Sequence, residues 1–374
     1  MFGRYPVSVL TLALIAALSA QAKQPASAAD LKIAVVDVEG GAATLFLTPE
    51  GKSLLIDTGW PPGMGGPAAK PGASPAPATS SADRIAAAAA AMGIEKIDYL
   101  EMTHYHVDHL GGLESLLKKL PVDTFIDHGP NRETLPPNAR ARAGGPSPAT
   151  LYPQWLAAYR GHRHITVHAG QTLKIGLLHL QFVASDGKIL GMPLPGAGEP
   201  NPPCMQVARK EATGGEENVR SLGAVMTFGK VRILDLGDLT WNKELELLCP
   251  VNMIGKVDVY FVTGHGMDLS NSPPTAAFDP LVAVLQNGPR KGGDPDAIRI
   301  VDSFPELEGF WRLHANARYS EMNGDPHYIA NLNEEPDRAY PIELDIARDG
   351  TITVTNPRND FSRTYQARGT EAGY

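Results

Sequence analysis

Three histidines and one aspartate lie within six consecutive residues, 104–109: His104, His106, Asp108 and His109. Imidazole nitrogens and carboxylate oxygens are the ligands that Zn²⁺, Fe and Mn²⁺ accept in proteins. On an extended chain His104 and His106 point to the same side, while Asp108 and His109 can turn toward a second ion. A solvated polar loop would explain one or two of these residues, but not four potential ligands at this spacing. The segment therefore predicts a metal site.

The flanking residues predict how these side chains are held. Residues 97–102 read as a short strand, and the leucines at 113, 116, 117 and 120 recur at helical spacing. Gly111 and Gly112 allow a tight turn between the two elements. The candidate ligands are therefore expected at a strand-to-helix junction.

The motif His-x-His-x-Asp-His followed by Gly-Gly resembles the signature of the metallo-β-lactamase superfamily. The resemblance implies an α/β fold, the αββα sandwich, with one or two metal ions at the edge between two β-sheets. Residues 31–59, which read as strand, strand, turn and strand ending in Asp57-Thr58-Gly59, resemble the usual opening of the family. In that pattern Asp57 orients the metal site from behind the ligands. A turn aspartate bonded to nearby backbone N–H groups is the other interpretation.

Further candidate ligands follow from the same resemblance. Asp238, in the Gly-Asp pair after the strand 231–236, resembles the family's bridging aspartate, since a carboxylate offers one oxygen to each of two cations. Asp235, inside that strand, is the competing candidate. His265 is the ligand expected from Thr-Gly-His-Gly, where relatives often carry His-His-Gly. His128, at the end of the strand 122–126, is the candidate third nitrogen ligand, although a loop histidine explains it as well.

These residues assign two sites for divalent ions, most simply Zn²⁺, with Mn²⁺ or Fe as alternatives. The first ion takes His104 and His106, with His128 as the candidate third ligand. The second takes Asp108, His109 and His265, and Asp238 bridges the two ions. A shared water whose pKa falls from about 15.7 toward roughly 7 would then be a hydroxide that attacks carbon or phosphorus. Asp108 and Asp238 are the expected catalytic carboxylates, and Asp108 can also accept a proton from the water.

Two serine-containing elements also resemble the branch of the superfamily that acts in bacterial DNA uptake. Ser221 ends an Asn-x-x-Ser element, and Ser272 follows the His-Gly pair as it does in relatives. Both serines are expected beside the ligands or the substrate. Residues 37–42 depart from that branch's Asp-Val-Gly-Gln-Gly-Asp, so the likeness concerns the fold more than the substrate.

Two segments rich in proline and glycine, about 61–80 and 186–218, are expected to be long irregular insertions in a single domain, residues 29–374. The first leaves directly from the Asp57 loop and should border the mouth of the site, either as a cover or as a passive surface loop. The two cysteines, Cys204 and Cys249, would form one disulfide or remain buried thiols.

The first 28 residues are expected to be a cleaved signal peptide. Arg4 precedes an apolar run, 7–18, and small-x-small sites lie at 20–22 and 26–28. The run is short for a membrane span, with an uncleaved anchor as the alternative. A periplasmic or secreted protein without stable membrane insertion after processing is predicted.

The charge limits the classes of substrate. The formal net charge is −8, and removing Arg4 and Lys23 with the signal peptide gives −8 − 2 = −10, which disfavours polyanionic partners. An exported metal-dependent hydrolase of a small-molecule ester, phosphoester or amide-like bond is therefore the first hypothesis. The alternatives are a phosphodiesterase or nuclease of the DNA-uptake type and a non-catalytic metal-binding module. A di-iron oxidoreductase ranks lower, because no dinucleotide fingerprint follows the candidate catalytic region.

Overall fold

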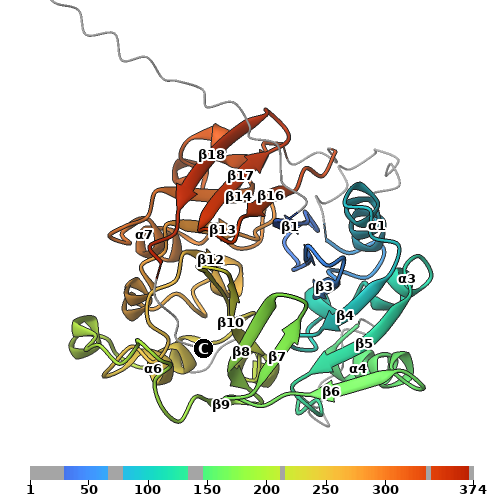
Figure 1. The fold of residues 1–374 in the computed structure, drawn as a ribbon, viewed down its shortest axis with the longest axis horizontal. Coiled ribbons are helices and arrows are strands. Elements are labelled where there is room, and N and C mark those ends of the chain that lie inside the picture. Colours follow the sequence, from blue (N-terminus) through green and yellow to red (C-terminus); the bar gives the residue numbers. More distant parts are fainter. Residues whose placement is uncertain (1–28, 66–78, 134–145, 211–214, 334–337, 370–374) are drawn as a thin grey trace, which may run out of the picture.

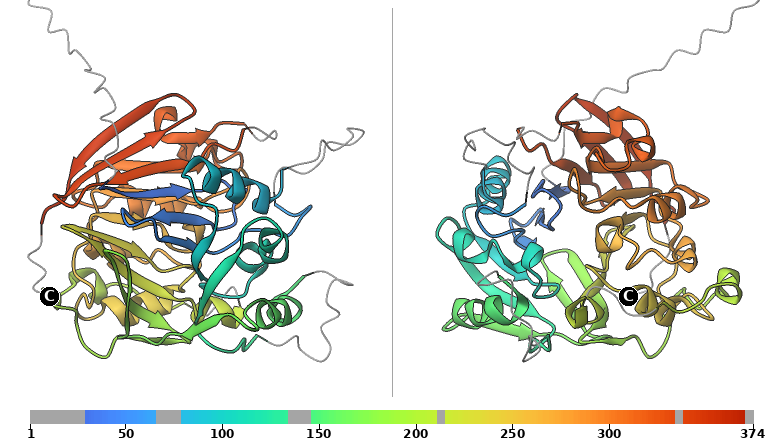
Figure 2. Two further views of the ribbon diagram at one scale, coloured as in Figure 1. Left: turned by 45° about the vertical axis from the view of Figure 1, so that its right-hand side comes forward. Right: turned by 180° about the vertical axis from the view of Figure 1, so that it is seen from behind.

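The computed structural model describes residues 29–65, 79–133, 146–210, 215–333 and 338–369. The expected signal peptide and most of the first insertion lie outside these residues. Within them, two nine-stranded sheets pack face to face, and helices cover the outer face of each sheet (Figures 1 and 2). This is the predicted αββα sandwich. No helix in the described part of the chain has the length and apolar character needed to cross a membrane.

The first sheet combines the N-terminal strands with the C-terminal hairpins. Its strands in spatial order are β18 (Phe361–Gln366), β17 (Thr351–Asn356), β16 (Ile342–Ile346), β1 (Leu31–Val35), β2 (Thr44–Leu47), β3 (Ser53–Ile56), β4 (Ile97–Glu101), β5 (Val122–Asp127) and β6 (Arg163–Thr166). The strands from β3 to β6 run parallel. Their carboxyl ends therefore meet at one edge, where Asp57, the histidine motif and His128 follow.

The second sheet repeats this arrangement with the later half of the chain. Its spatial order is β15 (Ile329–Asn331), β14 (Gly309–His314), β13 (Val282–Leu285), β12 (Val259–Phe261), β11 (Val231–Asp235), β10 (Gly223–Phe228), β8 (Leu178–Ser185) and β7 (Thr172–Ile175), and β9 (Lys188–Ile189) pairs with β8. The strands from β11 to β15 are parallel. Asp238 and His265 follow the carboxyl ends of β11 and β12, so they reach the same region as the motif.

The helices complete the outer layers. They are α1 (Ser81–Ala91), α2 (Val107–Leu110), α3 (Leu113–Leu117), α4 (Pro148–Ala158), α5 (Gly215–Val219), α6 (Trp241–Leu248) and α7 (Pro295–Asp302), with 3₁₀ turns η1 (Pro202–Met205), η2 (Thr263–Gly266), η3 (Pro273–Phe278), η4 (Ser320–Met322) and η5 (Pro326–Tyr328). In Figure 1, α1, α3 and α4 lie on the first sheet, and α6 and α7 belong to the opposite side. Ser80 caps α1 through a capping box with Asp83.

The two-residue period of the strands divides their side chains between two cores. Phe46 and Leu54 face the space between the sheets, whereas Leu45 and Leu55 face the helices. Phe46 and Phe261 meet edge to face across the inter-sheet core, with ring centroids 6.3 Å apart. This alternation fixes the register that sets the site at the sheet edge.

The second insertion is tied to the helical layer. A disulfide joins Cys204 in η1 to Cys249 at the end of α6, with the Cα atoms 5.6 Å apart. The sequence left open whether these cysteines pair, and the structure answers that they do. The insertion also contains β9 and the first residues of α5. It therefore has more regular structure than its proline- and glycine-rich composition suggests.

The inter-sheet core predicts a clear stability difference. Phe228, on β10, is fully buried between the sheets. Its replacement by alanine should lower the free energy of unfolding by about 3–5 kcal/mol, because a large cavity is left. Leu177→Ala, at a side chain that is 38% exposed, is the control and should change stability by less than about 0.5 kcal/mol. Urea denaturation measures both, and equal effects would contradict the assignment of this core.

Candidate metal centre

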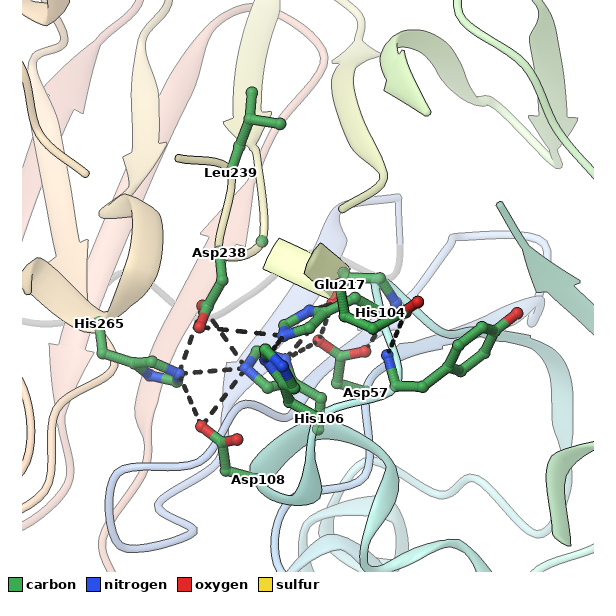
Figure 3. Close-up of polar contacts among 12 residues, drawn as sticks. Asp57, His104, His106, Asp108, Glu217, Asp238, Leu239 and His265 are labelled. Atoms are coloured by element: carbon green, nitrogen blue, oxygen red, sulfur yellow. Dashed lines mark hydrogen bonds and ion pairs between the residues drawn. The ribbon is translucent and has the colours of Figure 1, made fainter. Parts of the chain in front are cut away.

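Three segments that are distant in sequence converge at the edge between the sheets. His104 and His106 follow β4, Asp108 and His109 belong to α2, Asp238 follows β11, and His265 lies in η2 after β12 (Figure 3). Asp57, at the end of β3, lies behind them. All but His106 are almost entirely buried. The structure thus brings together the residues that the sequence predicted from separate motifs.

One group consists of Asp108, His109, Asp238 and His265, whose potential ligand atoms all lie within 4.8 Å of one another. The Nε2 atoms of His109 and His265 are 3.2 Å apart. His265 Nε2 is 3.4 Å from Asp238 Oδ1 and 3.3 Å from Asp108 Oδ2. Two imidazoles and two carboxylates at these separations can surround one cation.

A second pair of nitrogens lies on the other side of Asp238. His104 Nε2 is 3.0 Å from His106 Nδ1. Asp238 directs Oδ2 toward His104, at 3.9 Å, and Oδ1 toward His109, at 3.5 Å. Figure 3 shows this carboxylate between His265 and His104. The two oxygens of Asp238 are therefore divided between the two nitrogen pairs, as the predicted bridging role requires.

Hydrogen bonds outside the cluster determine which nitrogens face inward. Nδ1 of His109 donates to Asp57 Oδ2 at 2.7 Å, and Nδ1 of His265 donates to the carbonyl oxygen of Gln286 at 2.8 Å. Nδ1 of His104 lies 3.1 Å from the hydroxyl of Thr103. With a proton held on each outer nitrogen, the three Nε2 atoms are the ones that can bind a cation, and hydrogen bonds of this kind orient metal-binding histidines.

His106 is oriented the opposite way. Its Nε2 donates to Glu133 Oε2 at 3.1 Å, which leaves Nδ1 facing His104. Each pair of nitrogens therefore faces inward at hydrogen-bond distance, where either a proton or a cation can lie between the two atoms. The donor set of imidazole nitrogens and carboxylate oxygens fits two divalent ions.

The protonation states of the cluster favour ligation. Burial and the neighbouring His109 hold the pKa of His104 well below its usual value, so this imidazole is neutral. Burial alone would raise the pKa of Asp108 and Asp238, but the nearby Lys291 lowers the pKa of Asp108, and interactions with His265 and His109 lower that of Asp238. Both carboxylates are therefore ionised at neutral pH and available to a cation.

Asp57 occupies the position that its predicted role requires. Besides the His109 imidazole, it accepts hydrogen bonds from the backbone N–H of Thr103 at 2.8 Å and from its hydroxyl at 2.7 Å. The adjoining loop is equally close: Thr58 N–H donates to the His109 carbonyl at 2.7 Å. A Cβ on Gly112 would lie 2.0 Å from the Thr58 carbonyl oxygen, so only glycine permits this approach. The Asp57 loop and the motif are thus locked together.

Asp235 lies apart from the four-residue group. Its Oδ1 accepts the Gly237 N–H at 2.9 Å, and burial raises its pKa to about 6. The Asp235 carboxyl group therefore shapes the turn before Asp238. Asp238, and not Asp235, belongs to the four-residue group.

Three predicted site residues make their hydrogen bonds with residues other than the candidate ligands. His128 directs Nε2 to Glu217 Oε2, at 3.1 Å, rather than to His104 or His106. Ser272 donates its N–H to Glu244, and Ser221 donates its N–H to Asn218. Among the described residues, no hydrogen bond links either serine to a candidate ligand. Their expected positions beside the ligands therefore find no support in these contacts.

Two glutamates close to His104 and His106 were not predicted from the sequence. Glu133 holds His106, and the fully buried Glu217 accepts the Tyr105 N–H at 3.2 Å and the Arg132 N–H at 3.0 Å. Figure 3 places Glu217 beside His104, on the side where His128 was expected. The only signal for Glu217 was its place directly before the Asn-x-x-Ser element. Glu133 lies in a loop with no periodic pattern.

The comparisons with known proteins agree with this architecture. Residues 37–172, which contain the histidine motif but not Asp238 or His265, match a family model described as the metallo-beta-lactamase superfamily. No curated protein matches the sequence. The family match covers residues 37–172, and the αββα sandwich of the described chain is consistent with it.

Solved structures with some likeness include three proteins of different kinds. The metallo-β-lactamase fold protein YhfI from Bacillus subtilis has 13% identity and a TM-score of 0.41, with 76% of this chain and 95% of that chain covered. CmlA, a diiron β-hydroxylase from Streptomyces venezuelae, has 16% identity and a TM-score of 0.38, with 92% and 55% covered. A metallo-β-lactamase from Cronobacter sakazakii, as a HARLDQ motif mutant, has 16% identity and a TM-score of 0.32, with 57% and 67% covered. All three TM-scores are below 0.5.

The hydrogen bond from His109 to Asp57 predicts a measurable effect on metal affinity. Asp57→Asn should weaken Zn²⁺ binding by about 10- to 100-fold, because the amide holds the imidazole less firmly and makes it a poorer donor to the ion. Competition with a fluorescent chelator measures the affinity. Asp123→Asn, at an exposed carboxylate, is the matched control and should bind Zn²⁺ as the wild type does. An unchanged affinity of the Asp57 variant would contradict the role given to Asp57.

The protonation of His109 predicts that metal binding depends on pH. Burial alone lowers its pKa, but Asp238 and Asp108 outweigh burial and raise the pKa well above its usual value, so the metal-free imidazole keeps a proton at neutral pH. A cation must displace that proton. Zn²⁺ affinity should therefore rise as pH increases from about 6 to about 8, with proton release on binding.

Calorimetry in two buffers of different ionisation enthalpy measures this release. His168→Gln, at an exposed histidine outside the cluster, should release the same number of protons as the wild type. A wild-type affinity that does not change with pH would show that His109 carries no proton to displace.

Proposed function

We propose that this chain is a hydrolase that depends on two divalent metal ions held between its sheets. The main support for the proposal is the orientation of Asp238, whose two carboxylate oxygens face two separate pairs of inward-directed imidazole nitrogens. An arrangement for a single ion would need only one of these pairs.

The ions would supply a hydroxide nucleophile at neutral pH, as metal-bound water does when its pKa falls toward roughly 7. The residues of the chain supply the remaining requirements. His104 is held neutral, Asp108 and Asp238 are held ionised, and Asp57 keeps the proton of His109 on the outer nitrogen. Asp108 would also accept a proton from the nucleophilic water.

Zinc is the proposed metal, with Mn²⁺ or Fe as alternatives. The candidate donors are nitrogen and carboxylate oxygen, which all three metals accept. Both cysteines of the chain are in the disulfide, so no thiolate is available to the site. Export to the periplasm or beyond is proposed with this function, on the strength of the charged and apolar pattern of residues 1–28.

The proposed substrate is a small molecule with an ester, phosphoester or amide-like bond, and a phosphodiesterase or nuclease is the alternative. The negative net charge favours the small molecule. Arg132, Arg140, Arg142, Arg160 and Arg163 form a modest concentration of basic residues. Of these, Arg132 faces Asp186 at 3.9 Å, so part of this positive charge is already paired. Arg140 and Arg142 lie outside the described residues.

The proposal is tested by removing and restoring the metal. Protein treated with a chelator should lose hydrolysis of a panel that contains a phosphodiester, plasmid DNA, lactones and a chromogenic β-lactam, and should regain it with Zn²⁺ or Mn²⁺. His106→Ala should lower the rate by at least about 10²-fold, because a ligand of one ion is lost. His162→Ala, at an exposed histidine, is the control. Hydrolysis at an unchanged rate by stripped protein would refute the mechanism, and cleavage of the phosphodiester alone would favour the alternative.

A further inference from the structure

Lys291 brings a positive charge to the candidate metal centre without belonging to its ligand set. It lies in the loop between β13 and α7, and its Nζ contacts Asp108 Oδ2 and donates to the Gly40 carbonyl oxygen at 2.7 Å. The same ammonium lies 5.2 Å from the centroid of the Trp60 ring. The Lys291 side chain is 26% exposed and that of Asp108 is 9% exposed. The lysine therefore stands between the buried carboxylate and solvent.

Close backbone packing fixes the position of this lysine. A Cβ added to Gly40 would lie 3.1 Å from the Lys291 Cβ and 2.9 Å from the Gly288 nitrogen. The Gly288 N–H donates to the Lys291 carbonyl at 2.9 Å and closes the loop into a turn. Any larger residue at position 40 would push the two loops apart. Lys291 is thus held at the centre by the fold, unlike a flexible surface lysine.

The oxygen that Lys291 contacts is also the oxygen that faces the imidazoles. Asp108 Oδ2 is 3.3 Å from His265 Nε2 and 3.5 Å from His109 Nε2. An ammonium and a divalent cation on one oxygen repel each other strongly at such short range. A bound metal ion is therefore expected to displace the ammonium from Asp108. The Gly40 carbonyl and the face of Trp60 remain to hold it at the edge of the centre.

We propose that Lys291 binds a negatively charged group of the substrate beside the bond that is cleaved. This rests on the proposed function and names its substrate class: the substrate is an anion. The charged group is either a carboxylate close to the reacting carbonyl or the anionic oxygen of a phosphodiester. Both present an oxyanion to which an ammonium donates a charge-assisted hydrogen bond.

The experiment uses zinc-loaded, full-length protein and two pairs of nitrophenyl substrates that differ within each pair mainly in charge. Mono(4-nitrophenyl) glutarate is paired with 4-nitrophenyl pentanoate, and bis(4-nitrophenyl) phosphate with its neutral methyl triester. Lys291→Met removes the charge and keeps most of the aliphatic stem, and Lys291→Arg keeps the charge. Lys210→Met is the matched control, because Lys210 also lies over an aromatic ring, 3.5 Å from the centroid of Trp241, outside the candidate centre.

Lys291→Met should lower kcat/KM for the anionic member of the pair that the enzyme hydrolyses by about 10- to 100-fold, and for its neutral partner by less than about threefold. Lys291→Arg should retain most of the preference for the anion, and Lys210→Met should leave both values unchanged. A selective loss in the glutarate pair identifies a carboxylate, and one in the phosphate pair identifies a phosphodiester. Equal losses for charged and neutral substrates, or no loss at all, would overturn the proposal.

A binding measurement separates this proposal from the proposed function. Calorimetry with benzoate and phenylphosphonate on the zinc-loaded protein should give affinities at least about tenfold weaker for Lys291→Met than for the wild type. Equal affinities would overturn the role of Lys291 even in an active hydrolase. If the metal-loaded wild type hydrolyses no substrate, the proposed hydrolase fails, and the calorimetry alone decides whether Lys291 recognises anions.

Discussion

The cluster at the sheet edge depends on a charge imbalance that protein groups alone do not resolve. Imidazole nitrogens face each other at 3.0 and 3.2 Å, and Asp108 and Asp238 lie among them with little access to water. Burying ionised carboxylates away from water is costly unless a cation compensates them. The protons of the histidines and the ammonium of Lys291 provide part of that compensation. Divalent cations would provide it more completely, since they accept all of these donors at once.

The topology explains why such a cluster forms where it does. Each sheet has a parallel half, and the carboxyl ends of both halves meet at the same edge of the sandwich. Loops after β3, β4, β11 and β12 therefore converge, although His109 and His265 are 156 residues apart in sequence. The rigid sheets hold the candidate ligands, while the loops between β13 and α7 and after β1 bring Lys291 and Gly40 to the outside.

The parts of the site that could be predicted from the sequence are those formed by consecutive residues. The strand-to-helix junction from His104 to His109 follows from spacing alone. Asp238 and His265 needed the family resemblance, because their convergence depends on how the two sheets pack. The orientation of His128 could not be predicted, since it depends on Glu217, 89 residues further along the chain. Lys291 carried no signal, because a single lysine in a glycine-rich loop has no pattern until its neighbours in space are known.

The pairing of β1 with β16 has a consequence for how the chain can be divided. The first sheet is completed only when residues from the far end of the chain add β16, β17 and β18 beside the first strand. A fragment that stopped after the second sheet would leave β1 with a row of unpaired backbone N–H and carbonyl groups along an apolar strand. Exposed edges of this kind template pairing between molecules. Nascent or proteolysed chains that lack β16, β17 and β18 are therefore expected to self-associate through the exposed edge of β1, which these final strands cover in the complete sheet.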